Sequence, residues 1–334
     1  MRCFWDEAQR AHAPAAEFFN GALHPAADRP DRADAILGAI GRTEPSTAHG
    51  DDSIRRVHGA DYCAFLASAH ADWLAAGRTG DAFPYTFPVV GRRPLALQRI
   101  DARLGQYSFD TATPIGPDTW AATRAAVDTA LSALDAVLAG QRAAFALTRP
   151  PGHHAGADYC GGYSYLNHAA IAAEAALAAG KRRIAILDVD YHHGNGTQDI
   201  FYGRHDVIYA SIHADPVMDY PYYWGHADEK GSGDGESANL NLPLPRGTDW
   251  IAYRAALDRA IDWIGRFEAQ LLIVSYGADT YVGDPISHFA LETRDYRPMG
   301  RAIAALDLPT LIVMEGGYSA DALGANVAEF LGGF

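Results

Sequence analysis

Five short apolar runs, separated mostly by helical stretches, constrain the fold of this chain more than any other feature. None of the runs shows the polar alternation expected of a strand with one face in water. Strands of this kind form a parallel sheet covered by helices on both faces, so we expect an α/β fold with a mostly parallel central sheet. The runs are Ala143 to Leu147, Ile184 to Leu187, Val207 to Ile212, Leu271 to Val274 and Leu311 to Met314. The helical stretches between them are Asn167 to Ala179, Trp250 to Phe267 and Tyr296 to Leu306.

Each apolar run leads into a polar segment, and most of these segments contain glycine. In an open α/β sheet, ligands bind outside the carboxyl ends of the strands. The polar segments should therefore meet at one edge of the sheet and form a single active site. They are 149–154, 188–193, 211–213, 277–279 and 315–318.

Composition limits the partners and the location of the protein. The 334 residues carry a formal net charge of −14, which disfavours nucleic acid or an anionic membrane as a partner and suits a cationic ligand. Cys3, Cys63 and Cys160 show no paired spacing, so we expect no disulfide framework. Without an apolar leader or a run long enough to span a membrane, the sequence predicts a cytoplasmic protein. We expect one domain over residues 1–334.

Three of the polar side chains form a candidate metal centre. Asp190 and His192 are two residues apart, which places them on one face if strand geometry continues past the second apolar run. Asp279, after the fourth run, is the obvious third ligand. Two carboxylates and one imidazole leave coordination positions open, as in a catalytic site. With no thiolate, these ligand types allow Zn²⁺, Fe²⁺, Mn²⁺ or Co²⁺. Each aspartate alone could equally serve as a helix cap.

Two further features suggest acid–base chemistry. The pair His153–His154 follows a rigid Pro–Pro–Gly turn, and Asp188 is placed to accept a hydrogen bond from one of these histidines. A carboxylate behind an imidazole fixes its tautomer and raises its basicity, which suits a general base acting on water. Tyr318 follows two glycines, so its hydroxyl can approach a reacting carbonyl and stabilise an oxyanion.

An irregular segment of about residues 80–117 interrupts the pattern. It contains several prolines and aromatic residues, and a loop of this length inside a domain is usually functional. Aromatic residues near Tyr163 and Tyr220 are candidates for the walls of a narrow channel, although aromatic rings are more often part of a core.

The motifs resemble those of the histone deacetylase and acetylpolyamine amidohydrolase family, which has an arginase-like α/β fold. The similarity is close from about Phe145 to Tyr318 and loose before it. Five motifs occur in the family's order, and together they are highly specific. They are Arg-Pro-Pro-Gly-His-His (149–154), Gly-Gly-Tyr-Ser-Tyr-Leu-Asn (161–167), Asp-Val-Asp-Tyr-His-His-Gly-Asn-Gly-Thr-Gln (188–198), Gly-Ala-Asp-Thr with Gly-Asp-Pro (277–280 and 283–285), and Glu-Gly-Gly-Tyr (315–318).

The resemblance implies one Zn²⁺ per chain, with Fe²⁺ or Co²⁺ also compatible, and a monovalent cation, usually K⁺. The implied zinc ligands are Asp190, His192 and Asp279. The implied potassium ligands are Asp188, Asp190, the His192 backbone, Ser211 and Ile212. The implied lining of the substrate channel is Gly162, Tyr163, Tyr220 and Ile286.

The resemblance also implies catalytic roles in amide hydrolysis. Either His154 or His153 removes a proton from water, Tyr318 donates to the oxyanion, and a histidine protonates the leaving amine. We favour His154 as the acid–base residue, with His153 held by Asp188 as electrostatic support. Many relatives carry an aspartate at the position of Asn195. Loss of that charge should lower the pKa of His154 and favour its neutral form.

The expected substrate is a small acetylated polyamine such as acetylputrescine, acetylcadaverine or acetylspermidine. The segment 80–117 resembles an insertion that crosses a homodimer interface and narrows the tunnel in acetylpolyamine amidohydrolases, so we expect a homodimer. Asp101 or Asp110 of this segment is a candidate for binding a distal ammonium group. Two alternatives stay open, namely a protein lysine deacetylase and, more remotely, a non-catalytic sensor of acetylated amines.

Overall fold

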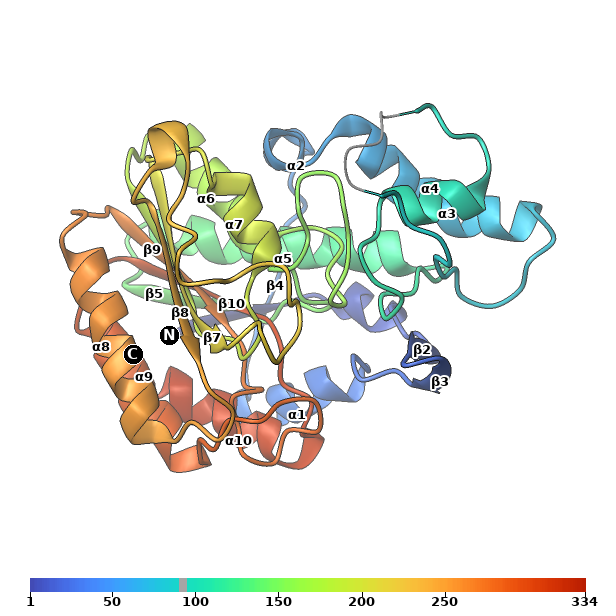
Figure 1. Ribbon diagram of the computed structural model, residues 1–334. Helices are drawn as coiled ribbons and strands as arrows, with labels where there is room; N and C mark the ends of the chain where they lie inside the picture. The colour runs from blue at the N-terminus through green and yellow to red at the C-terminus, as the bar shows by residue number, and fades with distance from the viewer. Residues whose placement is uncertain (90–94) are drawn as a thin grey trace.

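An eight-stranded parallel sheet forms the centre of the computed structural model, which describes residues 1–89 and 95–334 (Figure 1). Every neighbouring pair of strands in this sheet is parallel, which confirms the predicted α/β architecture. Across the sheet the strands follow the order β4 (Glu44–Pro45), β1 (Arg2–Trp5), β5 (Ala143–Ala146), β10 (Thr310–Met314), β9 (Leu271–Tyr276), β6 (Ile184–Asp188), β7 (Val207–Ala214) and β8 (Asn239–Leu244).

Alternate side chains of the central strands fill two separate hydrophobic cores. In β6, Ile184 and Ile186 point into one core, whereas Ala185 and Leu187 point into the other. Successive side chains of a strand point to opposite faces, so a strand that is apolar throughout must be covered on both faces. Each Ile or Leu removed from water contributes about 1.5–3 kcal/mol.

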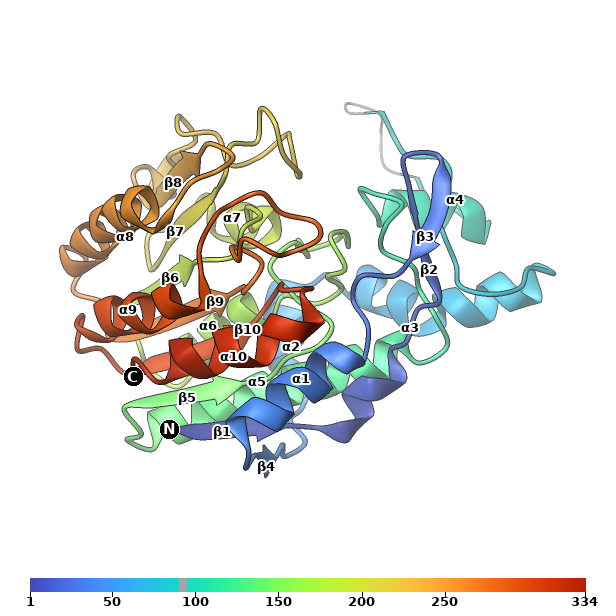
Figure 2. The same cartoon turned by 90° about the horizontal axis from the view of Figure 1, so that it is seen from below.

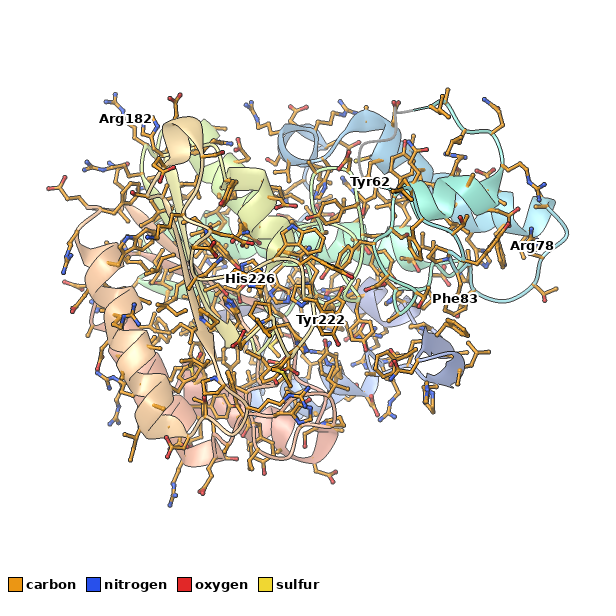
Figure 3. The ribbon with its side chains drawn as sticks, viewed as in Figure 1. Tyr62, Arg78, Phe83, Arg182, Tyr222 and His226 are labelled. Carbon is orange, nitrogen blue, oxygen red and sulfur yellow. The ribbon has the colours of Figure 1, made fainter. Side chains whose placement is uncertain are left out.

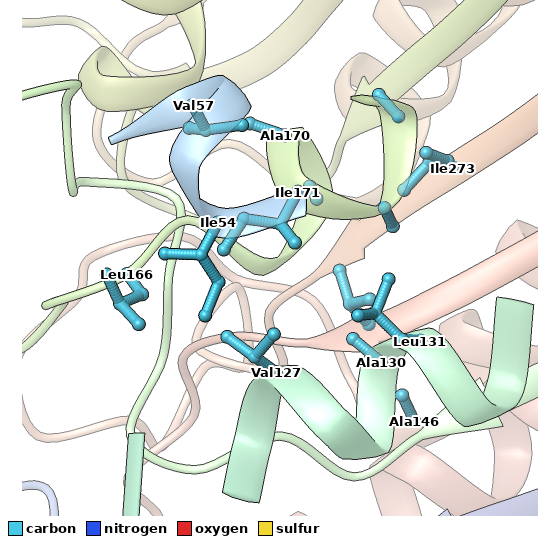
Figure 4. Packing of buried hydrophobic residues seen from close by; sticks show 14 of the residues in the cluster. Ile54, Val57, Val127, Ala130, Leu131, Ala146, Leu166, Ala170, Ile171 and Ile273 are labelled. Carbon is cyan, nitrogen blue, oxygen red and sulfur yellow. The ribbon is translucent and has the colours of Figure 1, made fainter. Parts of the chain in front are cut away.

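One helix layer covers each face of the sheet. The first layer contains α2 (Asp52–Val57), α3 (Ala60–Ala75), α5 (Thr119–Leu138) and α6 (His168–Ala178). Figure 4 shows side chains of α2, α5 and α6 that pack toward Ala146 of β5 and Ile273 of β9. The second layer contains α1 (Asp31–Ile40), α8 (Trp250–Gly265), α9 (Thr293–Ala304) and α10 (Ala320–Leu331). In Figure 2, α9, α10 and α1 lie side by side.

The segment 80–117, called the insertion below, closes on itself at its base. The backbone N–H of Ala82 donates to the carbonyl of Ile115 at 2.9 Å, and the reverse bond is 3.0 Å long. The insertion contains α4 (Ile100–Gln106), and its residues 90–94 lie outside the described residues. The treatment of residues 1–334 as one domain carrying this insertion stays a prediction.

A short hairpin near the N-terminus lies beside the insertion. It consists of β2 (Ala16–Phe19) and β3 (Ala22–Pro25) and follows the 3₁₀ helix η1 (Glu7–Ala11). The hydroxyl of Thr111 in the insertion donates to the carbonyl of Phe18 at 2.8 Å. In Figure 1 the hairpin and α4 lie on the side of the molecule opposite α8 and α9.

The predicted strands and helices all occur, with small shifts of their ends. The pattern did not reveal several short elements or the last helix. These are η1, the β2–β3 hairpin, β4, α2, α4, α7 (Asn195–Phe201), the short 3₁₀ helix η2 (Gly233–Gly235), β8 and α10. Within the described residues, no helix combines the length and the apolar character needed to cross a membrane.

Candidate active site

The order of the strands brings the predicted site residues together. β5, β10, β9, β6 and β7 are consecutive neighbours, and because they are parallel their carboxyl ends share one edge of the sheet. The convergence of the polar segments is therefore confirmed. One detail was wrong: β7 continues to Ala214, so Ser211 and Ile212 lie inside the strand rather than at its exit. Register pairs Ser211 with Asp188 of β6, so these two potential potassium ligands are neighbours.

Asp190, His192 and Asp279 form the candidate metal centre. Each offers one ligand atom, and these atoms all lie within 4.8 Å of one another. The Nδ1 atom of His192 is 3.1 Å from Asp279 Oδ2 and 3.4 Å from Asp190 Oδ1. Both carboxylates are fully buried. The three side chains therefore converge as expected for ligands of a single ion.

The local reason for this convergence differs from the one that the sequence suggested. β6 ends at Asp188, so Asp190 and His192 do not share a strand face. Instead, the Asp190 carboxylate accepts the backbone N–H of His192 at 2.8 Å, a short turn of the type aspartate commonly forms. The Asp279 carboxylate accepts the N–H of Tyr191 at 2.8 Å and ties the loop to β9.

The donor set fits a divalent cation. Two buried carboxylates close together are costly unless a cation compensates them, and a single imidazole cannot neutralise both. The backbone leaves room for them: a Cβ atom at Gly277 would lie 1.9 Å from Asp190 Oδ2, and one at Gly316 would lie 2.5 Å from Asp279 Oδ2. A side chain at either glycine would displace the carboxylates, so these positions keep the ligand geometry.

His153 is held as a cation by its surroundings. Its Nδ1 atom is 3.0 Å from Asp188 Oδ2, which also accepts the Tyr209 hydroxyl at 2.9 Å. Burial alone would lower the pKa of His153, but the Asp188 and Asp190 carboxylates outweigh it and raise this pKa to about 10. The predicted partnership of Asp188 with His153 therefore has the geometry of a hydrogen-bonded ion pair.

His154 has the opposite electrostatic character. Its Nδ1 atom lies 2.7 Å from the side-chain oxygen of Asn195. Burial, together with the nearby positive charges of His153 and His192, lowers the pKa of His154 well below its usual range. A neutral imidazole that donates from Nδ1 to Asn195 keeps a lone pair on Nε2, as a general base requires. The two neighbouring histidines thus differ in charge.

Tyr318 is positioned by a residue that the sequence did not single out. Arg32 of α1 lies over its ring, with the guanidinium carbon 4.6 Å from the ring centroid. The same side chain donates to the carbonyls of Gly317 at 2.6 Å and Glu315 at 2.7 Å. Burial raises the pKa of Tyr318 well above its usual range, so its hydroxyl stays protonated and can donate a hydrogen bond. Arg32 belongs to the N-terminal region, and no local pattern links it to Tyr318.

Glu315 joins two of the strand exits. Its buried carboxylate accepts the backbone N–H groups of Gly152 at 2.7 Å and His153 at 3.2 Å, and the hydroxyl of Ser275 at 3.0 Å. Glu315 therefore attaches the turn that bears His153 and His154 to β10, the strand that precedes Tyr318. The sequence carries one signal for this role, since Glu315 is an acidic residue directly after the apolar run that ends at Met314.

Of the four residues predicted to line the channel, Gly162 and Tyr220 lie beside His154, and Tyr163 lies beside Tyr318. The rings of Tyr220 and His154 are 5.2 Å apart, and those of Tyr163 and Tyr318 are 5.6 Å apart. Gly162 has a positive φ of 53°, and a Cβ atom there would lie 2.2 Å from the His154 ring. Ile286 lies two residues after Asp284, which accepts the Tyr318 N–H at 2.7 Å. All four lining residues thus connect to catalytic candidates.

Comparison with known proteins places this geometry in a family. The family model described as "Histone deacetylase domain" matches residues 27–334. Acetylpolyamine amidohydrolase 2 of Pseudomonas aeruginosa is 47% identical over 100% of this chain and 98% of its own. The crystal structure of acetylpolyamine aminohydrolase from Burkholderia pseudomallei superposes with a TM-score of 0.96 at 40% identity, over 100% of this chain and 98% of that one.

A third relative matches over a shorter range. The histone deacetylase-like amidohydrolase of Pseudomonas aeruginosa is 39% identical, but over 64% of this chain and 58% of its own. The full-length matches therefore include the N-terminal hairpin and the insertion. From the family model and these identities, the chain belongs to the histone deacetylase family and is an amidohydrolase.

Proposed function

We propose that this protein is a zinc-dependent amidohydrolase that removes acetyl groups from acetylated polyamines and releases acetate. The observation that carries the proposal is the extent of similarity: relatives named acetylpolyamine amidohydrolases match the full chain, whereas the histone deacetylase-like relative matches 64% of it. The hairpin and the insertion would then contribute to the recognition of the cationic polyamine chain.

The site residues support amide hydrolysis with divided roles. Bound zinc would polarise the acetyl carbonyl and make water a better nucleophile. His154, neutral and hydrogen-bonded to Asn195, would accept the proton of the attacking water and pass it to the leaving amine. Tyr318 would donate to the carbonyl oxygen as it gains negative charge. His153, cationic beside Asp188, would stabilise that charge electrostatically.

Buried acids near the channel walls support a cationic substrate. The Glu17 carboxylate of the hairpin lies against the Tyr163 hydroxyl, and Asp110 of the insertion accepts the Tyr220 hydroxyl. Neither acid forms a salt bridge within the described part of the chain, so an amine that entered the channel would meet acidic groups not already paired with a cation. The Asp110 oxygens accept hydrogen bonds from the protein itself, which leaves Glu17 as the better candidate for contact with an amine. Asp101 is a poor candidate because Arg78 and Arg99 already pair with it at 2.6 and 2.9 Å.

We also propose a homodimer and a potassium ion. Tyr85 and Val89 of the insertion are 72% and 67% exposed, and the neighbouring hairpin exposes Leu23. Exposed large apolar side chains are frequent at protein interfaces, which supports dimerisation through the insertion. For K⁺, the adjacent positions of Asp188 and Ser211 on β6 and β7 support the predicted ligand set.

Steady-state kinetics on a substrate panel tests the proposal. Zinc-loaded protein should turn over acetylputrescine, acetylcadaverine and acetylspermidine with a kcat/KM far above that for acetyl-lysine peptides. Comparable values for both substrate classes would favour a protein lysine deacetylase. If the zinc-loaded protein releases acetate from none of the acetylated amines, the remaining hypothesis is a non-catalytic sensor.

A further inference from the structure

Asp110 of the insertion makes contacts with both predicted walls of the channel. Its Oδ2 atom accepts the Tyr220 hydroxyl at 2.8 Å and the backbone N–H of Gly162 at 2.7 Å. Its Oδ1 atom accepts the N–H of Ala112 at 3.1 Å, and the Thr113 hydroxyl is a further donor. Both oxygens are thus occupied by groups of the protein itself.

The neighbours of Asp110 are bound to the same stretch of chain. The N–H of Phe109 donates to the Cys160 carbonyl at 3.1 Å, and the N–H of Cys160 donates to the Tyr107 carbonyl at 2.8 Å. The Thr113 hydroxyl accepts the N–H of Tyr163 at 2.9 Å. The last part of the insertion is therefore attached, bond by bond, to the segment that carries Gly162 and Tyr163.

The position of Tyr220 matters because its ring faces the reacting groups. The ring packs edge-on against His154 at 5.2 Å and His192 at 6.1 Å, and it stacks on Phe109 at 5.8 Å with an angle of 21° between the planes. Its hydroxyl is held by Asp110. In the view of Figure 3, Tyr222, two residues along, lies near the centre of the molecule, and Phe83 of the insertion lies to its right.

We propose that Asp110 is a positioning residue, which fixes Tyr220 and Gly162 against His154 and so sets the width of the substrate channel. It acts through these groups and does not itself bind the distal ammonium of the substrate. The inference rests on the proposed function, because it concerns how that same site selects a slim acetylated amine.

A double-mutant cycle tests the action through Tyr220. Asp110→Asn should lower kcat/KM for acetylputrescine about tenfold, since hydrogen bonds to a carboxylate are stronger than those to a neutral amide. Tyr220→Phe keeps the ring and should cost about threefold. The double variant should be no worse than Asp110→Asn alone, within about twofold, because the removed bond is the same one. Losses that multiply would overturn the proposal.

A neutral substrate separates positioning from direct binding of the cation. N-butylacetamide has the carbon chain of acetylputrescine but no ammonium group. Asp110→Asn should reduce kcat/KM for both compounds by the same factor. A loss confined to acetylputrescine would mean that Asp110 binds the ammonium itself, contrary to the proposal.

A control variant and a structural comparison complete the test. Asp72→Asn is the matched control: it removes one acid near the insertion whose partners are Ser68 and Arg103, and it should leave kcat/KM unchanged. Crystal structures of the wild type and Asp110→Asn should show the Tyr220 ring displaced in the variant. If the Tyr220 ring does not move, the positioning role of Asp110 is refuted, whatever the activity of the wild type. If the wild type hydrolyses no acetylated amine, the proposed function is refuted instead.

Discussion

At the carboxyl edge of the sheet the polar side chains are buried and multiply hydrogen-bonded, whereas the insertion exposes apolar side chains to solvent. Asp188, Asp190 and Asp279 are 0% exposed, while Tyr85 is 72% exposed. The first region is supported by strands whose neighbours are fixed by register. The second is joined to the rest through its base, through contacts of residues 107–114, and through α4, which pairs with α3 by the Arg103–Asp72 salt bridge.

The difference suggests a division of labour between the two regions. Groups that must keep their geometry to well within an ångström belong on rigid elements. Loops tolerate change more readily, so they are suited to substrate selection and to contacts with other chains. Variants at the sheet edge should therefore affect catalysis for every substrate, and so should variants of Asp110, which is bonded to Tyr220 and Gly162 beside that edge. Variants on the exposed face of the insertion should affect selection or assembly.

Removing the metal should have the largest effect. Dialysis against a chelator should abolish acetate release, and Zn²⁺ should restore it, because the ligand atoms of Asp190, His192 and Asp279 converge on a single ion that would activate water. Loss of the ion should also lower the thermal midpoint, since binding stabilises the folded state. Full activity in protein shown by elemental analysis to be metal-free would contradict the proposed site.

Tyr318→Phe should lower kcat by about 10² or more while the protein stays folded, as expected for the loss of an oxyanion donor. Phenylalanine preserves the ring beneath Arg32, so packing is unchanged. The loss should be the same for acetylpolyamines and for N-butylacetamide. Unchanged turnover would remove Tyr318 from the mechanism.

Arg32→Lys should lower kcat about tenfold with little change in KM. Lysine cannot donate in a planar fork to the carbonyls of Glu315 and Gly317, so the loop before Tyr318 loses its support. Arg29→Lys is the control, because Arg29 is exposed and pairs with Asp31. Equal kinetics of the two variants would argue against a positioning role for Arg32.

Changes to the exposed face of the insertion should have the smallest effect on chemistry. The double variant Tyr85→Ser and Val89→Ser should shift the protein from dimer to monomer in sedimentation velocity. Its kcat for N-butylacetamide should stay within about threefold of wild type, because the sheet edge is untouched. Ile251→Ser, on exposed α8, should not alter the mass. If the double variant keeps the wild-type mass, the interface lies elsewhere.

The fold could be predicted because its signals are local. Apolar strands such as Ile184 to Leu187 are recognisable from their own residues, and parallel pairing follows from the helices between them. β8 escaped notice because its sequence, Asn-Leu-Asn-Leu-Pro-Leu, alternates polar and apolar residues and contains a proline, as an edge strand can. α10 begins just after Tyr318, and its N-cap residue Ser319 makes no side-chain capping bond.

The candidate site could be predicted only where a residue lies next to a strand. His153, Asp190 and Asp279 follow apolar runs, so chain order brought them together. Arg32 and Asp110 reach the site from distant segments through tertiary contacts, which no local pattern encodes. The turn at Asp190 shows a related limit, because its carboxylate shapes the backbone that we had expected to remain a strand.

The paired hydrogen bonds between Ala82 and Ile115 have a consequence for the history and redesign of the enzyme. Because the chain leaves and re-enters at a single point, the part of the insertion before residue 107 can be lengthened, shortened or exchanged with that of a relative without a change in the path of any sheet strand, while residues 107–114 keep their bonds to Gly162 and Tyr163. The sequence of such a segment can change independently of the sequence of the sheet. New substrate ranges could therefore be obtained by grafting one segment onto an unaltered catalytic frame.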